Sequence, residues 1–249
     1  MNRRDAAELA GSVGVGAWTG FGVLAMVVVG GDGAPLWLDG TSLSWSVGHR
    51  PDILVALARG VTATGTGVVP YLLVVLAGVV AGRTARGRLT AAALALVCLA
   101  SGQALRYGVR DLVHRARPPQ ADWATTHASG WAFPSGHTTT AAITAGLLMV
   151  ALSLRAPRGG RALAVTAGCW ALLVGASRVY LGVHWLTDVI GGWLFAIGWL
   201  GICLCVMAHR LPGWFISSTT TGAPGDGTAG SADGRADGTA DGRAGRAAG

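Results

Sequence analysis

Six long apolar runs, separated by short polar stretches, dominate the pattern of hydrophobic and polar positions along the chain. Each run comes close to the length of about 20 residues that an α-helix needs to cross a bilayer. The pattern therefore predicts an all-α fold, a polytopic membrane protein with a bundle of six transmembrane helices. The runs cover residues 12–30, 61–82, 89–105, 138–154, 162–176 and 186–208.

The first two runs leave room for other interpretations. The polar start of the chain with Arg3 and Arg4 resembles a signal peptide, or weakly a twin-arginine signal. The run is longer than a signal core and no clear small-x-small site follows it, so we interpret it as an uncleaved span. Residues 31–52 are polar and turn-rich, and residues 53–60 are expected to form a short interfacial helix. Gly65 and Gly67 are expected to be accommodated inside one continuous second span.

Composition agrees with a membrane protein. Hydrophobic residues make up 51% of the 249 residues and charged residues 12%, with a mean hydropathy of +0.50. Soluble domains carry roughly twice that charged share. All 19 basic residues are arginine, and they lie in short loops without a basic stripe, so no nucleic-acid partner is expected. The four cysteines fall in apolar segments and are interpreted as small buried hydrophobes.

Six spans place both termini on one side of the membrane, and the arginines predict which side that is. Nine arginines lie on the terminal side (Arg3, Arg4, Arg83, Arg86, Arg88, Arg155, Arg158, Arg161, Arg210), and seven lie on the other (Arg50, Arg59, Arg106, Arg110, Arg115, Arg117, Arg178). The two shortest loops, each with three arginines, lie on the terminal side. The positive-inside rule therefore predicts cytoplasmic termini in the cell membrane.

The predicted domain organisation has three parts. Residues 1–11 form a cytoplasmic N-terminus, residues 12–210 the six-helix membrane domain, and residues 217–249 a cytoplasmic tail. The tail repeats Ala-Asp-Gly-Arg and Ala-Asp-Gly-Thr and has almost nothing to bury, which predicts disorder. A calcium-binding repeat is the alternative, but the ligand spacing of known calcium loops is missing.

Three polar clusters fall on the predicted outer side of the bundle. One holds Arg110 and Arg117-Pro118, the second is Pro134-Ser135-Gly136-His137, and the third joins Ser177-Arg178 to His184 and Asp188. Pro134 and Ser135 predict the start of a helix, whose free N–H groups and dipole favour an anion. Arginines can add bidentate hydrogen bonds, so the predicted ligand is a phosphate.

The spacing of His184 and Asp188 predicts a nucleophile. Side chains four residues apart share a helical face, where the carboxylate can hold the Nδ1–H of the imidazole. The free Nε2 can then attack phosphorus to give a phosphohistidine, while His137 protonates the leaving oxygen. Acidic residues outside the tail form no obvious metal-ligand cluster, so a mechanism without metal or other cofactor is expected.

These motifs resemble the three-part signature of the type 2 phosphatidic acid phosphatase (PAP2) superfamily, in its integral membrane branch. The resemblance rests on Arg117-Pro118, on Pro134 to His137, and on Ser177-Arg178 followed at the family spacing by His184 and Asp188. It covers roughly residues 10–210. Arg110 stands where the family motif has lysine, which keeps the charge but changes the reach and the donor geometry.

The resemblance implies a helical bundle of the PAP2/haloperoxidase type that hydrolyses phosphomonoesters or pyrophosphates without metal. It implies that His184 is the nucleophile, that His137 is the acid and that Asp188 orients His184. It assigns phosphate binding to Arg110, Arg117, Ser135, Gly136 and Arg178. Lipid phosphates are the expected substrates, among them undecaprenyl pyrophosphate, phosphatidic acid and phosphatidylglycerol phosphate. The sequence does not choose among these lipids, and it leaves the oligomeric state open.

Other polar residues near span ends are interpreted as structural. Arg50, Arg59, Arg106 and Arg115 are expected to be interfacial anchors, and His49, His114 and His127 ordinary loop residues. Three rival functions stay open: a lipid phosphotransferase with the same phosphohistidine, an anion-binding transporter without turnover, and a vanadate-dependent haloperoxidase. The apolar spans count against the last, which is soluble, and the pairing of His184 with Asp188 counts against the transporter.

Overall fold

The computed structural model describes residues 3–125, 128–156 and 159–210, and these ranges contain helices and no strands. The predicted disordered tail lies outside them. A 3-10 turn, η1, covers Gln120–Asp122. The α-helices are α1 (Arg3–Gly30), α2 (Trp37–Gly48), α3 (Asp52–Thr64), α4 (Val68–Ala81), α5 (Ala85–Val113), α6 (Gly136–Arg155), α7 (Gly160–Tyr180) and α8 (Leu186–Arg210).

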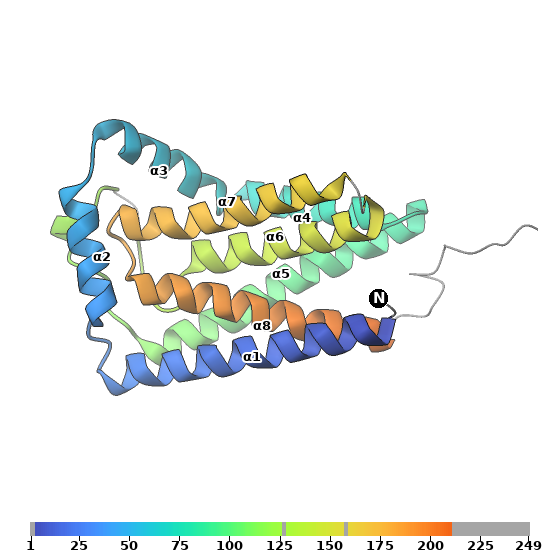
Figure 1. Ribbon diagram of the computed structural model, residues 1–249, viewed down its shortest axis with the longest axis horizontal. Helices are drawn as coiled ribbons and strands as arrows, with labels where there is room; N and C mark the ends of the chain where they lie inside the picture. Colours follow the sequence, from blue (N-terminus) through green and yellow to red (C-terminus); the bar gives the residue numbers. More distant parts are fainter. Residues whose placement is uncertain (1–2, 126–127, 157–158, 211–249) are drawn as a thin grey trace, which may run out of the picture.

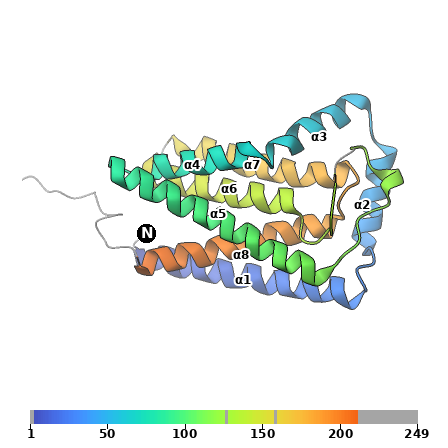
Figure 2. The same ribbon diagram turned by 180° about the vertical axis from the view of Figure 1, so that it is seen from behind.

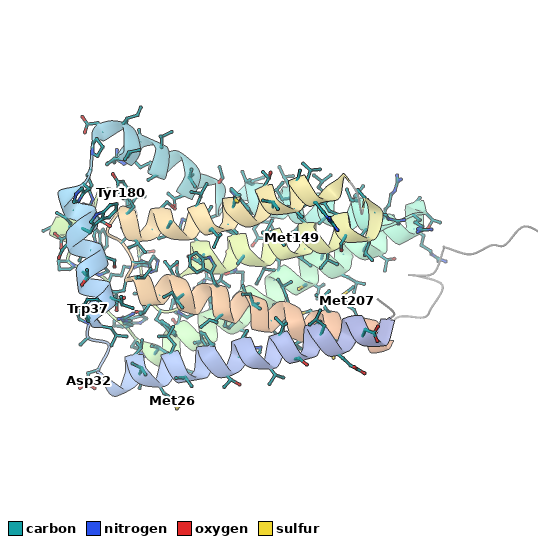
Figure 3. All side chains as sticks on the ribbon, viewed as in Figure 1. Met26, Asp32, Trp37, Met149, Tyr180 and Met207 are labelled. Atoms are coloured by element: carbon teal, nitrogen blue, oxygen red, sulfur yellow. The ribbon has the colours of Figure 1, made fainter. Side chains whose placement is uncertain are left out.

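The long helices run side by side, and the short helix α2 lies across one end of the bundle (Figure 1). α1 packs along α8, and α6 packs against both α7 and α8, which puts α6 near the middle. The same arrangement is visible from behind (Figure 2). The start of α1 and the end of α8 lie together at the end away from α2 (Figure 1). Trp37 and Tyr180 mark the α2 end, and Met207 marks the other end (Figure 3).

The prediction of an all-α bundle with six spans is confirmed, with one correction. Five helices in the described ranges are long and apolar enough to cross a membrane, and α3 and α4 together could form a sixth span, bent by 52°. The second span is therefore not one continuous helix over residues 61–82. Gly67 has a φ of 68°, which favours glycine and breaks the helix. Gly65 is also required, because a Cβ there would clash with the buried side chain of Val174.

Three other helices differ from the predicted pattern. α1 begins at Arg3, and α5 extends from Ala85 to Val113, so the polar residues after position 105 are helical. α2 forms inside the stretch expected to be turn-rich. Its start is stabilised because the Asp39 carboxylate accepts a hydrogen bond from the Leu36 backbone N–H at 3.0 Å.

An aromatic cluster fixes the backbone just before α6. Phe133 is fully buried and stacks on Phe21 of α1 with a centroid distance of 5.6 Å. Phe195 of α8 meets Phe21 edge-on at 5.5 Å. Such contacts add to the burial of three large side chains. The cluster therefore anchors the Pro134 to His137 segment to both α1 and α8.

Candidate active site

The three predicted motifs meet in one pocket at the α2 end of the bundle. The pocket has a volume of about 450 Å³ and a largely polar lining. Six of the eight predicted site residues line it: Arg110, Arg117, Gly136, His137, Arg178 and His184. The side chains of α5, α6 and α7 converge there with the two connections that follow α5 and α7.

The Pro134 to His137 segment does start a helix, as predicted, but Ser135 acts differently from the expectation. Ser135 is the N-cap residue of α6, yet its side chain makes no capping hydrogen bond. Its hydroxyl is fully buried and accepts a hydrogen bond from Thr138 Oγ1 at 3.0 Å. The Ser135 N–H donates to the Asp188 carbonyl oxygen at 3.0 Å. In this structure Ser135 therefore joins α6 to α8 behind the pocket lining.

His184 and Asp188 form the predicted pair by a different local geometry. His184 lies in the connection before α8, so the two residues do not share a helical face. Instead Asp188 Oδ2 lies 3.2 Å from His184 Nδ1 and accepts the Trp185 N–H at 2.9 Å. A carboxylate in the first turn of α8 thus binds the chain just before the helix. The contact favours the tautomer with the proton on Nδ1 and leaves Nε2 as the acceptor.

Arg117 lies directly beside the expected nucleophilic atom. Its Nη1 is 2.9 Å from His184 Nε2. Its other N–H groups donate to the carbonyl oxygens of Gly130, Val183, Ser129 and Trp131 at 2.8 to 3.3 Å. All five guanidinium N–H donors therefore have acceptors. Arg117 holds two loops together, and a substrate must displace one of these contacts to bind it.

The other two predicted arginines, Arg110 and Arg178, differ in how many of their N–H groups already have hydrogen-bond partners. Arg110 lines the pocket, but its Nε and Nη2 lie 2.9 and 2.8 Å from Asp111 Oδ1. Arg178 is buried, and its Nη1 donates to Thr62 Oγ1 at 3.0 Å. The Nε atom of Arg178 has no hydrogen-bond partner among the residues that the structure describes. A buried unpaired guanidinium N–H is costly, which favours an anion beside Arg178.

The bend between α3 and α4 brings two threonines to the site. Thr62 binds Arg178, as described above, and Thr66 Oγ1 lies 3.4 Å from His137 Nε2. Trp170 of α7 holds the bend by donating its indole N–H to Thr64 Oγ1 at 2.8 Å. The broken span therefore supplies hydroxyl groups to His137 and Arg178. The expected continuous second span gave no reason to place these threonines in the site.

The prediction that Arg106 and Arg115 are interfacial anchors is wrong, because both side chains are buried. Arg106 lines the pocket. Arg115 is fully enclosed and connects two carboxylates: its Nη2 lies 2.7 Å from Asp39 Oδ2 and its Nη1 2.7 Å from Asp188 Oδ1. Asp39 also accepts hydrogen bonds from the N–H and hydroxyl of Thr187 at 2.9 Å. We call Asp39, Arg115 and Asp188 the buried ion triad.

The remaining predicted anchors also contact the protein. Arg50 donates to the carbonyl oxygens of Tyr180 and Asp122, and Arg59 donates to that of Ala124. These bonds tie the connection after α5 to α3 and to the end of α7. His114 ends α5 with a φ of 50° and packs edge-on against Trp131. In the sequence these residues look like interfacial anchors, since each is a polar residue near an apolar run, so their contacts within the protein could not be predicted.

The electrostatics of the pocket keep His184 neutral. Burial, followed by the positive charges of Arg117 and Arg178, lowers the pKa of the His184 imidazole well below its ordinary value. Burial also lowers the pKa of Arg117, although Asp188 opposes this shift. A neutral imidazole with its Nδ1–H bound to a carboxylate carries its lone pair on Nε2, so His184 is chemically suited to attack an electrophile once a substrate displaces the Arg117 hydrogen bond to Nε2.

The donor set of the site points to anions and not to cations. Among the described ranges no group of three or more His, Cys, Asp or Glu side chains is arranged to hold a metal ion. The pocket lining has four arginines, two histidines and no carboxylate. Of the carboxylates nearby, Asp39 and Asp188 are paired with Arg115, and Asp111 is paired with Arg110. Such a lining is complementary to phosphate.

Comparison with known proteins places the site in a family. A family model described as the PAP2 superfamily matches residues 91–212. Phosphatidylglycerophosphatase B of Bacillus subtilis (strain 168) is 36% identical over 110 residues, which are 43% of this chain and 52% of that protein. The chain thus spans about half the length of this curated relative.

A solved structure agrees with the observed fold. It is the crystal structure of the first transmembrane PAP2 type phosphatidylglycerolphosphate phosphatase from Bacillus subtilis. The likeness has a TM-score of 0.61 and 27% sequence identity, and it covers 79% of this chain and 94% of the other. Together with the apolar helices and the three converging motifs, these matches show that the chain is a multi-pass membrane protein whose residues 91–212 form a PAP2 superfamily domain.

Proposed function

We propose that the protein is a phosphatase that hydrolyses a lipid phosphate or lipid pyrophosphate without metal. The observation that carries the proposal is the orientation of the His184 ring. Its Nδ1 lies 3.2 Å from Asp188 Oδ2, and the ring lines a pocket that also contains four arginines. A transporter would need the arginines but would have no use for a buried, oriented imidazole. The same pairing is what a nucleophile requires.

In the proposed first step, the His184 Nε2 lone pair attacks the phosphorus atom. An N–P bond forms and the bond between phosphorus and the leaving oxygen breaks. His137, which the negative charge of the bound phosphate holds in its protonated form, gives its proton to that oxygen, so the leaving group departs as a neutral alcohol or as a protonated phosphate. Asp188 stabilises the positive imidazole ring, and the arginines stabilise the charge on the phosphoryl oxygens.

In the proposed second step, a water molecule loses a proton to His137 and its oxygen attacks the phosphohistidine. The N–P bond breaks, inorganic phosphate leaves and His184 returns to its neutral form. Arg117 can then recover its contact with Nε2, which is 2.9 Å long in the free site. His137 is again protonated, so the cycle balances in protons.

A lipid substrate fits the position of the pocket. The pocket lies at one end of a bundle whose outer surface is apolar, with Trp37 and Leu112 exposed to 79% and 81% near that end. Lipid headgroups occupy this depth of the bilayer, with tryptophan at the interface. The name of the relative favours phosphatidylglycerol phosphate among the three expected substrates that we propose to test, with undecaprenyl pyrophosphate and phosphatidic acid as the other two.

The full chain, purified in detergent, is expected to release inorganic phosphate from at least one of these three lipids in excess EDTA. The rate with EDTA should equal the rate without it, because the proposed charge stabilisation comes from arginines. Colorimetric phosphate release across the panel measures this. Loss of activity with EDTA and recovery with Mg²⁺ would contradict the metal-free mechanism, and no release from any lipid would contradict the proposed function.

We propose that both termini are cytoplasmic and that the pocket opens on the outer side. Of the seven arginines at the pocket end, Arg106, Arg115 and Arg178 are buried, so few remain as loop charges there. The excess of loop arginines at the end of the termini is therefore larger than the sequence count suggests. Gln120→Cys should react with a membrane-impermeant maleimide in intact cells, and Arg86→Cys only after lysis. The opposite labelling pattern would reverse the orientation.

A further inference from the structure

The arginines of the pocket differ sharply in how many N–H groups they can offer to a ligand. Arg117 has an acceptor for each of its N–H groups, and Arg110 is paired with Asp111. Arg106 donates only from Nε, to Gln103 Oε1 at 2.9 Å. Within the described ranges, the Tyr107 side chain is the one other group within hydrogen-bonding reach of the guanidinium, no acceptor on another element binds Nη1 or Nη2, and Arg106 lines the pocket. Arg106 is therefore an uncommitted donor in a site built for an anion.

Arg106 is also held in a defined place. Its guanidinium carbon lies 4.1 Å from the centre of the Tyr107 ring, a cation–π contact. A Cβ at Gly136 would lie 3.2 Å from the same carbon and 3.4 Å from both Nη atoms. The guanidinium therefore lies against the first residue of α6, where the free N–H groups of the helix start also favour an anion. Because Gly136 has no Cβ, both the Arg106 guanidinium and a ligand can approach its backbone closely.

A short hydrogen-bond chain fixes the orientation of Arg106. Gln103 accepts from Arg106 Nε and donates from Nε2 to Thr140 Oγ1 at 2.7 Å. Thr140 donates in turn to the Gly136 carbonyl oxygen at 2.8 Å. The chain links α5 to the first turn of α6 and uses Nε, the N–H that a bidentate contact through Nη1 and Nη2 does not need. The free side of the fork stays available to a ligand.

We propose that Arg106 is a substrate-binding residue that donates from Nη1 and Nη2 to the phosphate oxygens, and that Gln103 is its positioning residue. Arg106 lies outside the three motifs on which the resemblance rests, one helical turn before Arg110. The inference rests on the proposed function to the extent that phosphate is the group bound. It assigns to Arg106 the contact expected of Arg110, whose guanidinium is held by Asp111.

The test measures anion binding without turnover. Orthovanadate and inorganic phosphate are titrated into the purified full chain by isothermal calorimetry, for the wild type and for Arg106→Gln, Arg106→Lys and Gln103→Leu. A pair of charge-assisted hydrogen bonds is worth a factor of roughly 10 to 100 in Kd for Arg106→Gln. Lysine keeps the positive charge and loses the paired N–H donors, so the Kd of Arg106→Lys should lie between those of the wild type and Arg106→Gln. Arg86→Gln, an exposed arginine of the same helix, should bind as the wild type does.

The outcomes separate this inference from the proposed function. Arg106→Gln with a wild-type melting temperature and an orthovanadate Kd within twofold of the wild type would overturn it, as would a wild type that binds neither anion. If Arg106→Gln does not fold, Gln103→Leu decides: binding weakened by about 2- to 10-fold supports the role, and unchanged binding overturns it. Anion binding that depends on Arg106 without phosphate release from any lipid would refute the phosphatase and leave the binding residue.

Discussion

Replacement of His184 by alanine is expected to reduce phosphate release from a lipid substrate by roughly 10³-fold or more, because the proposed covalent route loses its nucleophile. The ring is buried, and its Nδ1 lies 3.2 Å from Asp188 Oδ2. The measurement is kcat with the best substrate of the panel. A second readout is acid-labile, base-stable phosphate on the protein after rapid quenching, which should appear in the wild type and be absent from His184→Ala.

The matched control for this variant is His49→Ala, which removes an exposed histidine at the end of α2. It should keep wild-type kcat and the quenched phosphoprotein. Full activity in His184→Ala would disprove the assignment of the nucleophile. Loss of turnover with the phosphoprotein still present would move the nucleophile to another residue and leave His184 a role in the second step.

Replacement of Arg115 by leucine is expected to destabilise the fold by about 3–5 kcal/mol, since it leaves two buried carboxylates without their cation. In the buried ion triad, Arg115 lies 2.7 Å from both Asp39 and Asp188, and all three side chains are fully buried. The thermal midpoint in detergent measures the loss. We also expect kcat to fall in any folded fraction, because Asp188 then loses the contact that fixes the carboxylate beside His184.

Two variants test the electrostatic reason. Arg59→Gln, in which an exposed arginine loses its hydrogen bond to a loop carbonyl, should keep the wild-type midpoint. The double variant Arg115→Leu with Asp39→Asn removes the charge of one stranded carboxylate and keeps an acceptor for the Leu36 and Thr187 donors, so it should recover part of the lost stability. A wild-type midpoint in Arg115→Leu would refute the explanation, and so would a double variant that is less stable than the single one.

Motif spacing was sufficient to predict which chain segments meet. The number of spans, the helix start after Ser135 and the convergence of His137, Arg178 and His184 all follow from residue order and apolar run length. The spacing from His184 to Asp188 identified their contact but gave the wrong local structure. A carboxylate can reach a residue four positions earlier across a helix start as well as along one face, and the sequence does not distinguish the two cases.

Burial explains what the sequence could not predict. Arg106 and Arg115 lie after the end of the same apolar run, as an interfacial anchor does, and only the packing of distant helices reveals that both are enclosed. Asp39 gave no signal because its partners Arg115 and Thr187 are far away in sequence. The break in the second span was visible as Gly65 and Gly67, but glycine serves close helix packing and helix breaks alike.

The buried ion triad also joins the region matched by the family model to a helix outside it. The family match covers residues 91–212, yet Asp39 belongs to α2, and Thr62 and Thr66, which contact Arg178 and His137, belong to the bent pair. A fragment limited to the matched region would keep every signature residue while Arg115 lost half of its ionic contacts. The recognisable segment is thus not a transplantable module, and a chimera that exchanges it between relatives has to carry α2 and the α3–α4 bend with it.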